Sequence, residues 1–107
     1  MPDAFDEREK TFEKKFVKDE DLRFRALARR NKALALWVAG LKGRSAAEAE
    51  EYAKAFVAAE VGRSDDDVAV ALRQELERAG IDISDHRLRR KMEEALVEAM
   101  EAVKSGS

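Results

Sequence analysis

The first forty or so residues constrain the fold most, because they predict one helix that the rest of the chain is too short to cover. This helix is predicted to begin between Asp3 and Asp6 and to end near Leu41. At the usual rise per residue, forty helical residues span about 60 Å. The other helical segments are each about half that length or shorter. We therefore expect residues 1–19 to project beyond the folded domain, and we call them the arm.

Serine caps and glycine stops divide the remaining sequence into three further helices. Ser45 and Glu48 have the spacing of a capping box, in which each side chain bonds to the other residue's backbone N–H. The other signals are Gly43, Gly62, Ser64, Gly80 and Ser84. The short loops between these segments favour antiparallel neighbours, and no segment has the alternation of a strand. The sequence predicts an all-α protein, with a four-helix bundle at 20–104 and a frayed tail at 105–107.

Apolar residues at spacings of three and four give each helix one core-facing side. In the first helix, Leu27, Leu34, Val38 and Leu41 fall within a narrow arc, with Trp37 at its margin. The later stripes contain Ala49, Tyr52, Ala53, Phe56, Val57, Val68, Leu72, Leu76, Ala79, Leu88, Met92, Leu96, Ala99 and Val103. Ile83 and Leu88 have the spacing of a hydrophobic staple. Leu36 lies opposite the core arc. It is therefore expected either to be buried between other helices or to serve as a docking residue.

Composition excludes several classes of protein. The 107 residues are enough for one domain, and the absence of Cys removes disulfides and thiol chemistry. His86 is the only His, and no nucleophile, base and oxyanion donor can be assembled around it. We expect a protein that is not an enzyme and that has no metal or cofactor. His86 itself is predicted to be a surface residue.

The charge pattern and hydropathy predict a cytoplasmic protein that does not insert into a membrane. The longest uncharged run, Ala33 to Leu41, has nine residues, whereas a membrane helix needs about 20. The N-terminus is acidic and carries no apolar stretch of the signal-peptide kind. Charged residues make up 41% of the chain, but the net charge is only −2. Such balance argues against nucleic-acid binding, which usually requires a basic domain.

The arm carries an aromatic stripe that its own helix cannot cover. Phe5, Phe12 and Phe16 share one face and account for three of the five Phe residues. An isolated helix of this length is marginal in water, so we expect the arm of the free protein to be mobile and to become fully helical when the stripe docks on a partner. The alternative is that the three rings fold back onto the bundle.

Two basic clusters and one acidic cluster offer other hypotheses. The run from Arg23 to Lys32 holds five cations and no acid, and it permits either phosphate or nucleic-acid binding or docking on an acidic protein surface. A second cluster, His86 to Lys91, places cations near the start of a helix, where the helix dipole disfavours positive charge. We therefore expect Asp82 and Asp85, or a partner, to offset this unfavourable charge. Asp65, Asp66 and Asp67 point in different directions from one helical turn. They therefore favour a dipole role over a cation site.

Several short segments of the chain are each too common to identify a family, but their combined order and spacing is specific. They are Phe5 to Lys10, Phe12-Glu13, Lys15-Phe16, Ala28 to Lys32, Leu36-Trp37, Tyr52 to Lys54, Gly80 to His86 and Arg89 to Met92. Together they resemble the zeta subunit of alphaproteobacterial F-type ATP synthases, over nearly the whole chain. The resemblance implies a four-helix bundle with an inhibitory N-terminal arm.

The resemblance also implies how such a protein acts. The arm would enter a catalytic interface between an α and a β subunit of F1, near the γ stalk, and block rotation in the hydrolysis direction. The partners would be these α, β and γ subunits, and the free protein would be a monomer. The protein would lie at the periphery of the inner membrane when bound. The matching partner-binding positions are Phe5, Asp6, Arg8, Glu9, Lys10, Phe12, Glu13, Lys15 and Phe16. Possible secondary docking residues are Arg25, Arg29, Arg30 and Lys32.

Overall fold

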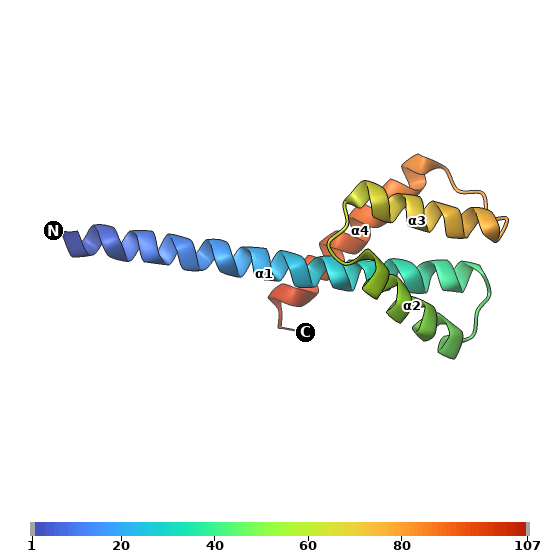
Figure 1. Ribbon diagram of the computed structural model, residues 1–107, viewed down its shortest axis with the longest axis horizontal. Helices are drawn as coiled ribbons and strands as arrows, with labels where there is room; N and C mark the ends of the chain where they lie inside the picture. Colours follow the sequence, from blue (N-terminus) through green and yellow to red (C-terminus); the bar gives the residue numbers. More distant parts are fainter. Residues whose placement is uncertain (1, 107) are drawn as a thin grey trace.

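The computed structural model contains four helices and, between residues 2 and 106, no β-strand (Figure 1). Helix α1 spans Pro2–Leu41, α2 spans Ala46–Glu60, α3 spans Asp65–Arg78 and α4 spans Asp85–Lys104. The structure describes the backbone of residues 2–106 and the side chains of residues 20–106. The all-α prediction is confirmed. The projection and mobility of the arm, together with the side chains of residues 1–19, lie outside what is described and stay predictions.

The helix boundaries follow the predicted capping chemistry. Ser45 Oγ accepts a hydrogen bond from the Glu48 N–H, and Glu48 Oε1 accepts one from the Ser45 N–H, both at 3.2 Å. Ser64 and Ser84 cap α3 and α4 in the same way, each accepting from a backbone N–H at 3.1 Å. Gly43, with φ of 73°, allows the chain to reverse after α1. These local predictions are confirmed because each depends on only a few adjacent residues.

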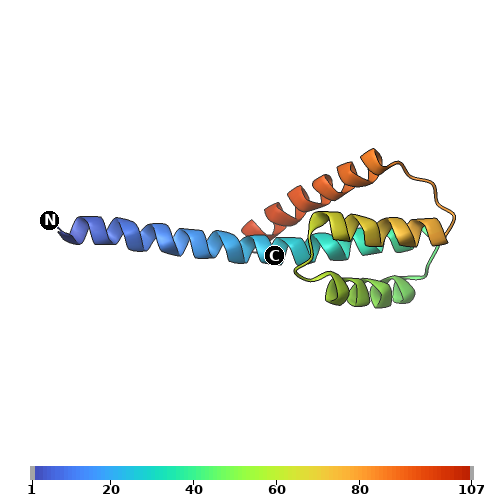
Figure 2. The same cartoon turned by 45° about the horizontal axis from the view of Figure 1, so that its top comes forward.

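Helix α1 is the centre of the packing. The most extensive backbone contacts between helices involve α1, which packs mainly against α2 and α4 and less against α3. In Figures 1 and 2, α2 and α3 lie alongside the second half of α1, whereas α4 crosses it obliquely. Short loops predicted that helices adjacent in sequence would be the main neighbours. This is confirmed for α1 and α2, whereas α3 and α4 contact α1 more extensively than they contact each other.

Two groups of buried apolar residues hold the helices together. The larger one, the main core, draws on all four helices and on the loop before α4. Its buried members are Leu34, Ala35, Val38, Ala53, Phe56, Val68, Ala69, Leu72, Leu76, Ile83, Leu88, Met92 and Ala95. The smaller one, the α1–α4 cluster, consists of Ala26, Ala99 and Val103, with Leu22, Leu96 and Met100 packed against it and only partly buried.

Some predicted core residues are less buried than their spacing suggested. The prediction for Leu41 is wrong, since this side chain is 45% exposed. It is the last residue of α1, and the chain turns away directly after it. The prediction for Ala79 is also wrong, since this C-cap residue of α3 is exposed. Leu27, Trp37 and Leu96 are half-buried. Leu36 is also half-buried and packs against the main core, which favours burial over docking for this residue.

Candidate protein-interaction surface

The nine partner-binding positions predicted in the arm all fall within residues 1–19. Their side chains lie outside the described residues, so their roles stay predictions. The described part of α1 continues directly from the arm. It carries the four cations predicted as secondary docking residues, and these can be placed.

Three of those four cations are on the surface. Arg25, Arg29 and Lys32 are exposed. Arg25 Nη2 lies 2.8 Å from Asp21 Oδ2, four residues earlier on α1. Lys32 Nζ lies 3.9 Å from Glu50 Oε2 of α2. Exposed pairs of this kind contribute about 0–1 kcal/mol each, so these two ion pairs add little to the stability of the fold.

Arg30 differs from the expectation of a solvated basic face. Only 2% of it is exposed. Its Nη1 donates to Asp65 Oδ1 of α3 at 2.7 Å, and its Nε and Nη2 donate to Asn31 Oδ1 at 3.1 and 2.8 Å. A buried guanidinium is tolerable only when it is paired in this way. Arg30 therefore links α1 to α3, and the nucleic-acid alternative loses one of its proposed contacts.

The three consecutive carboxylates at the start of α3 pair with three different arginines. Asp65 meets Arg30, Asp66 Oδ1 lies 2.8 Å from Arg89 Nη1 of α4, and Asp67 Oδ2 lies 3.8 Å from Arg63 Nε. Their divergence agrees with the prediction from helix geometry. Within residues 20–106, no group of three or more metal-ligating side chains could hold an ion. This turn therefore joins α3 to its neighbours.

The basic start of α4 is offset by nearby groups, as predicted for Asp85. Asp85 Oδ1 lies 3.5 Å from Arg73 Nη2 and 4.0 Å from Arg89 Nε. The Lys91 ammonium stands 5.6 Å from the centroid of the Trp37 ring, a cation–π distance. His86 is exposed, which confirms the expected surface position.

At the loop end of the bundle, Lys42, Glu75 and Tyr52 form a partly buried polar group. Lys42 Nζ donates to Glu75 Oε1 and lies 5.5 Å from the centroid of the Tyr52 ring. The hydrogen bond from Lys42 lowers the pKa of Glu75. Burial, with the nearby Glu75 charge, raises the pKa of Tyr52 to about 12. Both pKa values are moved further from neutral pH, whereas an efficient general acid or base has a pKa close to neutral pH.

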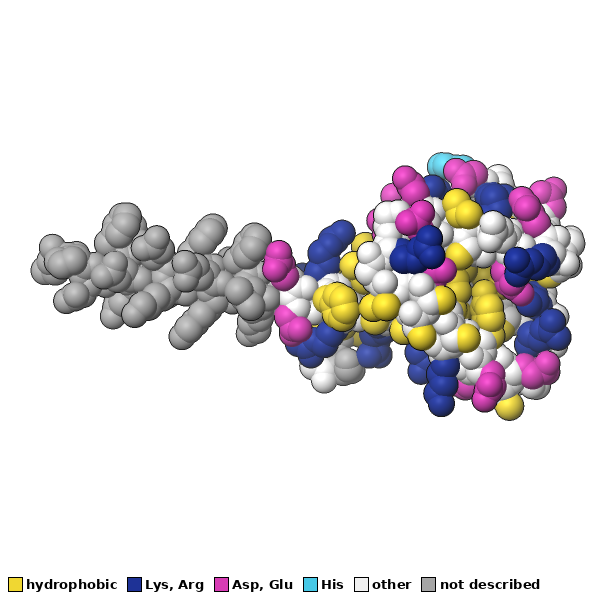
Figure 3. Space-filling model, in the orientation of Figure 1, with side chains coloured by type: hydrophobic (Ala, Val, Ile, Leu, Met, Phe, Trp, Pro, Cys, Tyr) yellow, Lys and Arg dark blue, Asp and Glu magenta, His cyan; other side chains and the backbone are white. Residues whose placement is uncertain are grey.

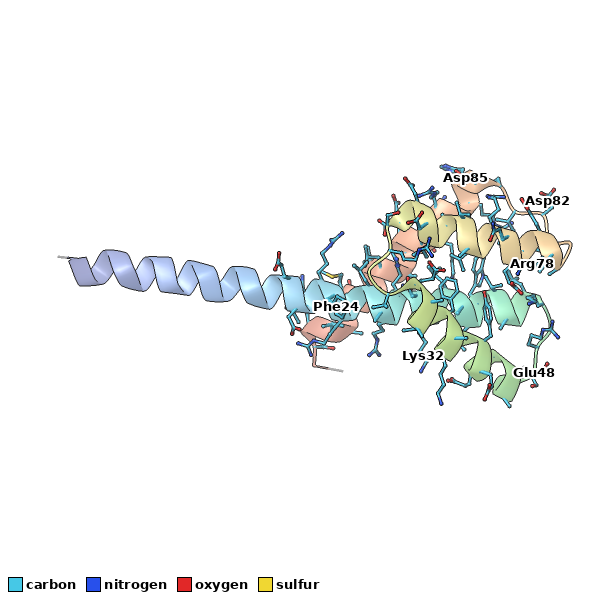
Figure 4. The ribbon with its side chains drawn as sticks, viewed as in Figure 1. Phe24, Lys32, Glu48, Arg78, Asp82 and Asp85 are labelled. Carbon is cyan, nitrogen blue, oxygen red and sulfur yellow. The ribbon has the colours of Figure 1, made fainter. Side chains whose placement is uncertain are left out.

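The described surface also has a hollow that sequence reasoning missed. The Phe24 hollow, of about 120 Å³, lies between α1 and the end of α2. Phe24, Leu27, Val57 and Val61 supply its apolar walls, with Glu60 and Arg63 among its polar lining. Figure 3 shows hydrophobic surface at the edge of the described region of α1, where Figure 4 labels Phe24. The available signal was an aromatic residue placed between two arginines, Arg23 and Arg25.

The described residues thus form a small helical scaffold with interaction surfaces and salt-bridged helix junctions. Among them, no helix is both long and apolar enough to cross a membrane. The family model for ATPase inhibitor subunit zeta matches residues 2–102, and the chain belongs to that family. This confirms the resemblance seen in the sequence and supports a regulatory, inhibitory role toward an ATPase. A comparison with curated proteins gave no match.

Proposed function

We propose that this protein inhibits ATP hydrolysis by the F1 part of ATP synthase through its arm. The arm enters a catalytic interface between an α and a β subunit and, near γ, opposes rotation in the hydrolysis direction. The observation that carries the proposal is the family match, which begins at residue 2 and therefore includes the arm. The Phe5, Phe12 and Phe16 stripe supports it, because aromatic residues are frequent among the anchors that dominate binding energy.

The protein acts in this proposal by occupying space, and none of its residues carries out chemistry. The phenyl rings fill apolar pockets of the interface. Arg8, Lys10 and Lys15 meet acidic groups and chiefly set register and encounter rate. The bundle at 20–104 remains outside the interface. The free protein is a cytoplasmic monomer that needs no cofactor, and it reaches the inner membrane only when bound to the enzyme.

A deletion and two truncations test the role of the arm in assays of ATP hydrolysis by the cognate F1. We expect deletion of residues 1–17 to abolish inhibition. Phe12→Ala and Phe16→Ala should each weaken it by about 2 kcal/mol or more, roughly 30-fold in dissociation constant. Lys14→Ala is the matched control, because helical periodicity predicts that residue 14 falls opposite the phenylalanine stripe. A protein that lacks residues 1–17 and still inhibits fully would disprove the proposal.

Thermal melts of the same variants separate docking from folding. A docking residue should leave the melting temperature nearly unchanged. If Phe12→Ala lowers the melting temperature as much as truncation of a fully buried leucine does, the ring packs on the bundle instead. That result would favour the alternative in which the arm folds back.

A further inference from the structure

We propose that the Phe24 hollow is a second docking point for the ATPase, separate from the arm. Its occupant is a segment of F1 that inserts one apolar side chain and donates an N–H hydrogen bond to Glu60. This inference rests on the proposed function, and it adds a contact between the bundle and the enzyme.

The walls of the hollow are apolar groups that the fold leaves in water. Phe24 is 57% exposed and Val61 is 54% exposed, although each could have been a polar residue without loss to either core. They converge on the half-buried Leu27 and Val57. Single exposed apolar residues are ordinary, but a group of them that rims a hollow marks an interaction site. The volume of about 120 Å³ suits a single inserted side chain.

The polar lining of the hollow includes an acceptor that lacks a donor. The Glu60 side chain is only 9% exposed, and its buried Oε2 accepts no hydrogen bond from any described residue. Arg63 Nε forms an ion pair with this oxygen at 3.6 Å, but that distance is too long for a hydrogen bond. The neighbouring Arg30 is already committed to Asp65 and Asn31. A buried carboxylate oxygen without a hydrogen bond is costly, so a partner N–H that draws the Glu60 side chain toward the hollow gains by binding here.

The position of the hollow on the helix explains why F1 is the occupant. Phe24 lies five residues beyond the arm on the same helix, which is about 8 Å of helical rise. An enzyme that holds the arm therefore brings its own surface next to this hollow. Two linked contacts of this kind raise the overall affinity, because the second forms at a high effective concentration.

Serine substitutions in the full chain test the apolar half of the proposal. We expect Phe24→Ser to raise the concentration for half-inhibition of F1 by about 10-fold, and Val61→Ser by about 5-fold. Val97→Ser is the matched control, because Val97 is 58% exposed and lies on α4 outside the hollow. Thermal melts should show similar stability for all three variants. Inhibition by Phe24→Ser and Val61→Ser equal to that by Val97→Ser would overturn the inference.

Glu60→Gln tests the hydrogen-bond half. Glutamine has the same shape as glutamate, but its amide replaces one acceptor oxygen with an NH2 group, which cannot accept the hydrogen bond of the partner's N–H. We expect inhibition to weaken by about 5-fold or more. To separate binding from folding, the variant is compared at a temperature where its melt shows it fully folded. Unchanged inhibition would overturn the assignment of a partner donor.

Photo-crosslinking identifies the occupant directly. With p-benzoylphenylalanine in place of Phe24, we expect a covalent product with an α, β or γ subunit, and no such product when the probe replaces Val97. A product only with a second copy of this chain, or none at all, would overturn the inference. The proposed function fails separately, when the wild-type protein does not inhibit or when deletion of residues 1–17 has no effect.

Discussion

The main core and the α1–α4 cluster show how unevenly this small protein is stabilised. The main core joins all four helices, and Leu34, Leu72 and Leu88 are fully buried there. The α1–α4 cluster joins only two helices, and its buried members are Ala26, Ala99 and Val103. Because hydrophobic stabilisation scales with the apolar area removed from water, the end of the bundle nearest the arm is held less strongly.

The difference between the two clusters coincides with a difference in surface. At the loop end, a partly buried ion pair between Lys42 and Glu75 joins the end of α1 to α3. The end nearest the arm leaves Phe24 exposed and Leu22, Leu96 and Met100 only partly buried. Regions that serve in binding are often drawn from the less stable parts of a fold. The comparison therefore indicates that stability is concentrated away from the proposed interaction surface, and the following variants test it.

Leu34→Ala should have the largest effect, because Leu34 is fully buried in the main core. We expect a loss of about 2–5 kcal/mol in the free energy of unfolding, from lost burial and the cavity that remains. Chemical denaturation monitored by circular dichroism measures it. A loss below about 1 kcal/mol would show that the main core is not the dominant source of stability.

Asp65→Asn should come next, because it removes the carboxylate that pairs with the buried Arg30 guanidinium. We expect a loss of about 1–3 kcal/mol, the usual cost of leaving a buried polar group without its partner. Asp67→Asn is the matched control in the same helical turn, and its exposed pair with Arg63 predicts a loss of about 0–1 kcal/mol. Equal effects of the two substitutions would mean that Arg30 does not need Asp65.

Leu96→Ala sharpens the comparison between the clusters. Leu96 has the same side chain as Leu34, but it is only half-buried against the α1–α4 cluster. We expect a loss of about 1 kcal/mol, within the range of ordinary substitutions. If Leu96→Ala and Leu34→Ala destabilise the protein equally in parallel denaturation experiments, the two ends of the bundle are not different in stability.

The smallest effect concerns acid and the Lys42–Glu75 pair. The pKa of Glu75 is lowered from its ordinary value of 4.5 in the folded state. The pair therefore contributes stability above about pH 4.5 and loses it as the pH falls through the lowered pKa. We expect Glu75→Gln to cost about 1 kcal/mol or less at neutral pH, and to lose less stability than the wild type on acidification. Denaturation curves at neutral pH and near pH 3 measure both. Equal acid sensitivity of the two proteins would contradict this role.

Much of the fold could be predicted because its signals are local. Ser45, Ser64 and Ser84 start their helices through contacts with residues only three positions away. Most of the main core followed from apolar spacing on each helix. The family was also evident from the sequence, because the order of several short segments is specific. The predicted site in the arm stays a prediction, since its side chains lie outside the described residues.

What the sequence by itself determined is the set of helices, their ends and the apolar face of each, because capping bonds and helical periodicity depend only on neighbours along the chain. Only the tertiary structure decided how far each face is covered. It left Leu41 in water, buried Arg30 against Asp65, and divided the interior into a large and a small cluster. It also placed Phe24 beside Val61 and the Glu60 side chain, whose Oε2 accepts no hydrogen bond from the described residues. These outcomes depend on which helices meet and at what angle, and periodicity within one helix carries no information about that.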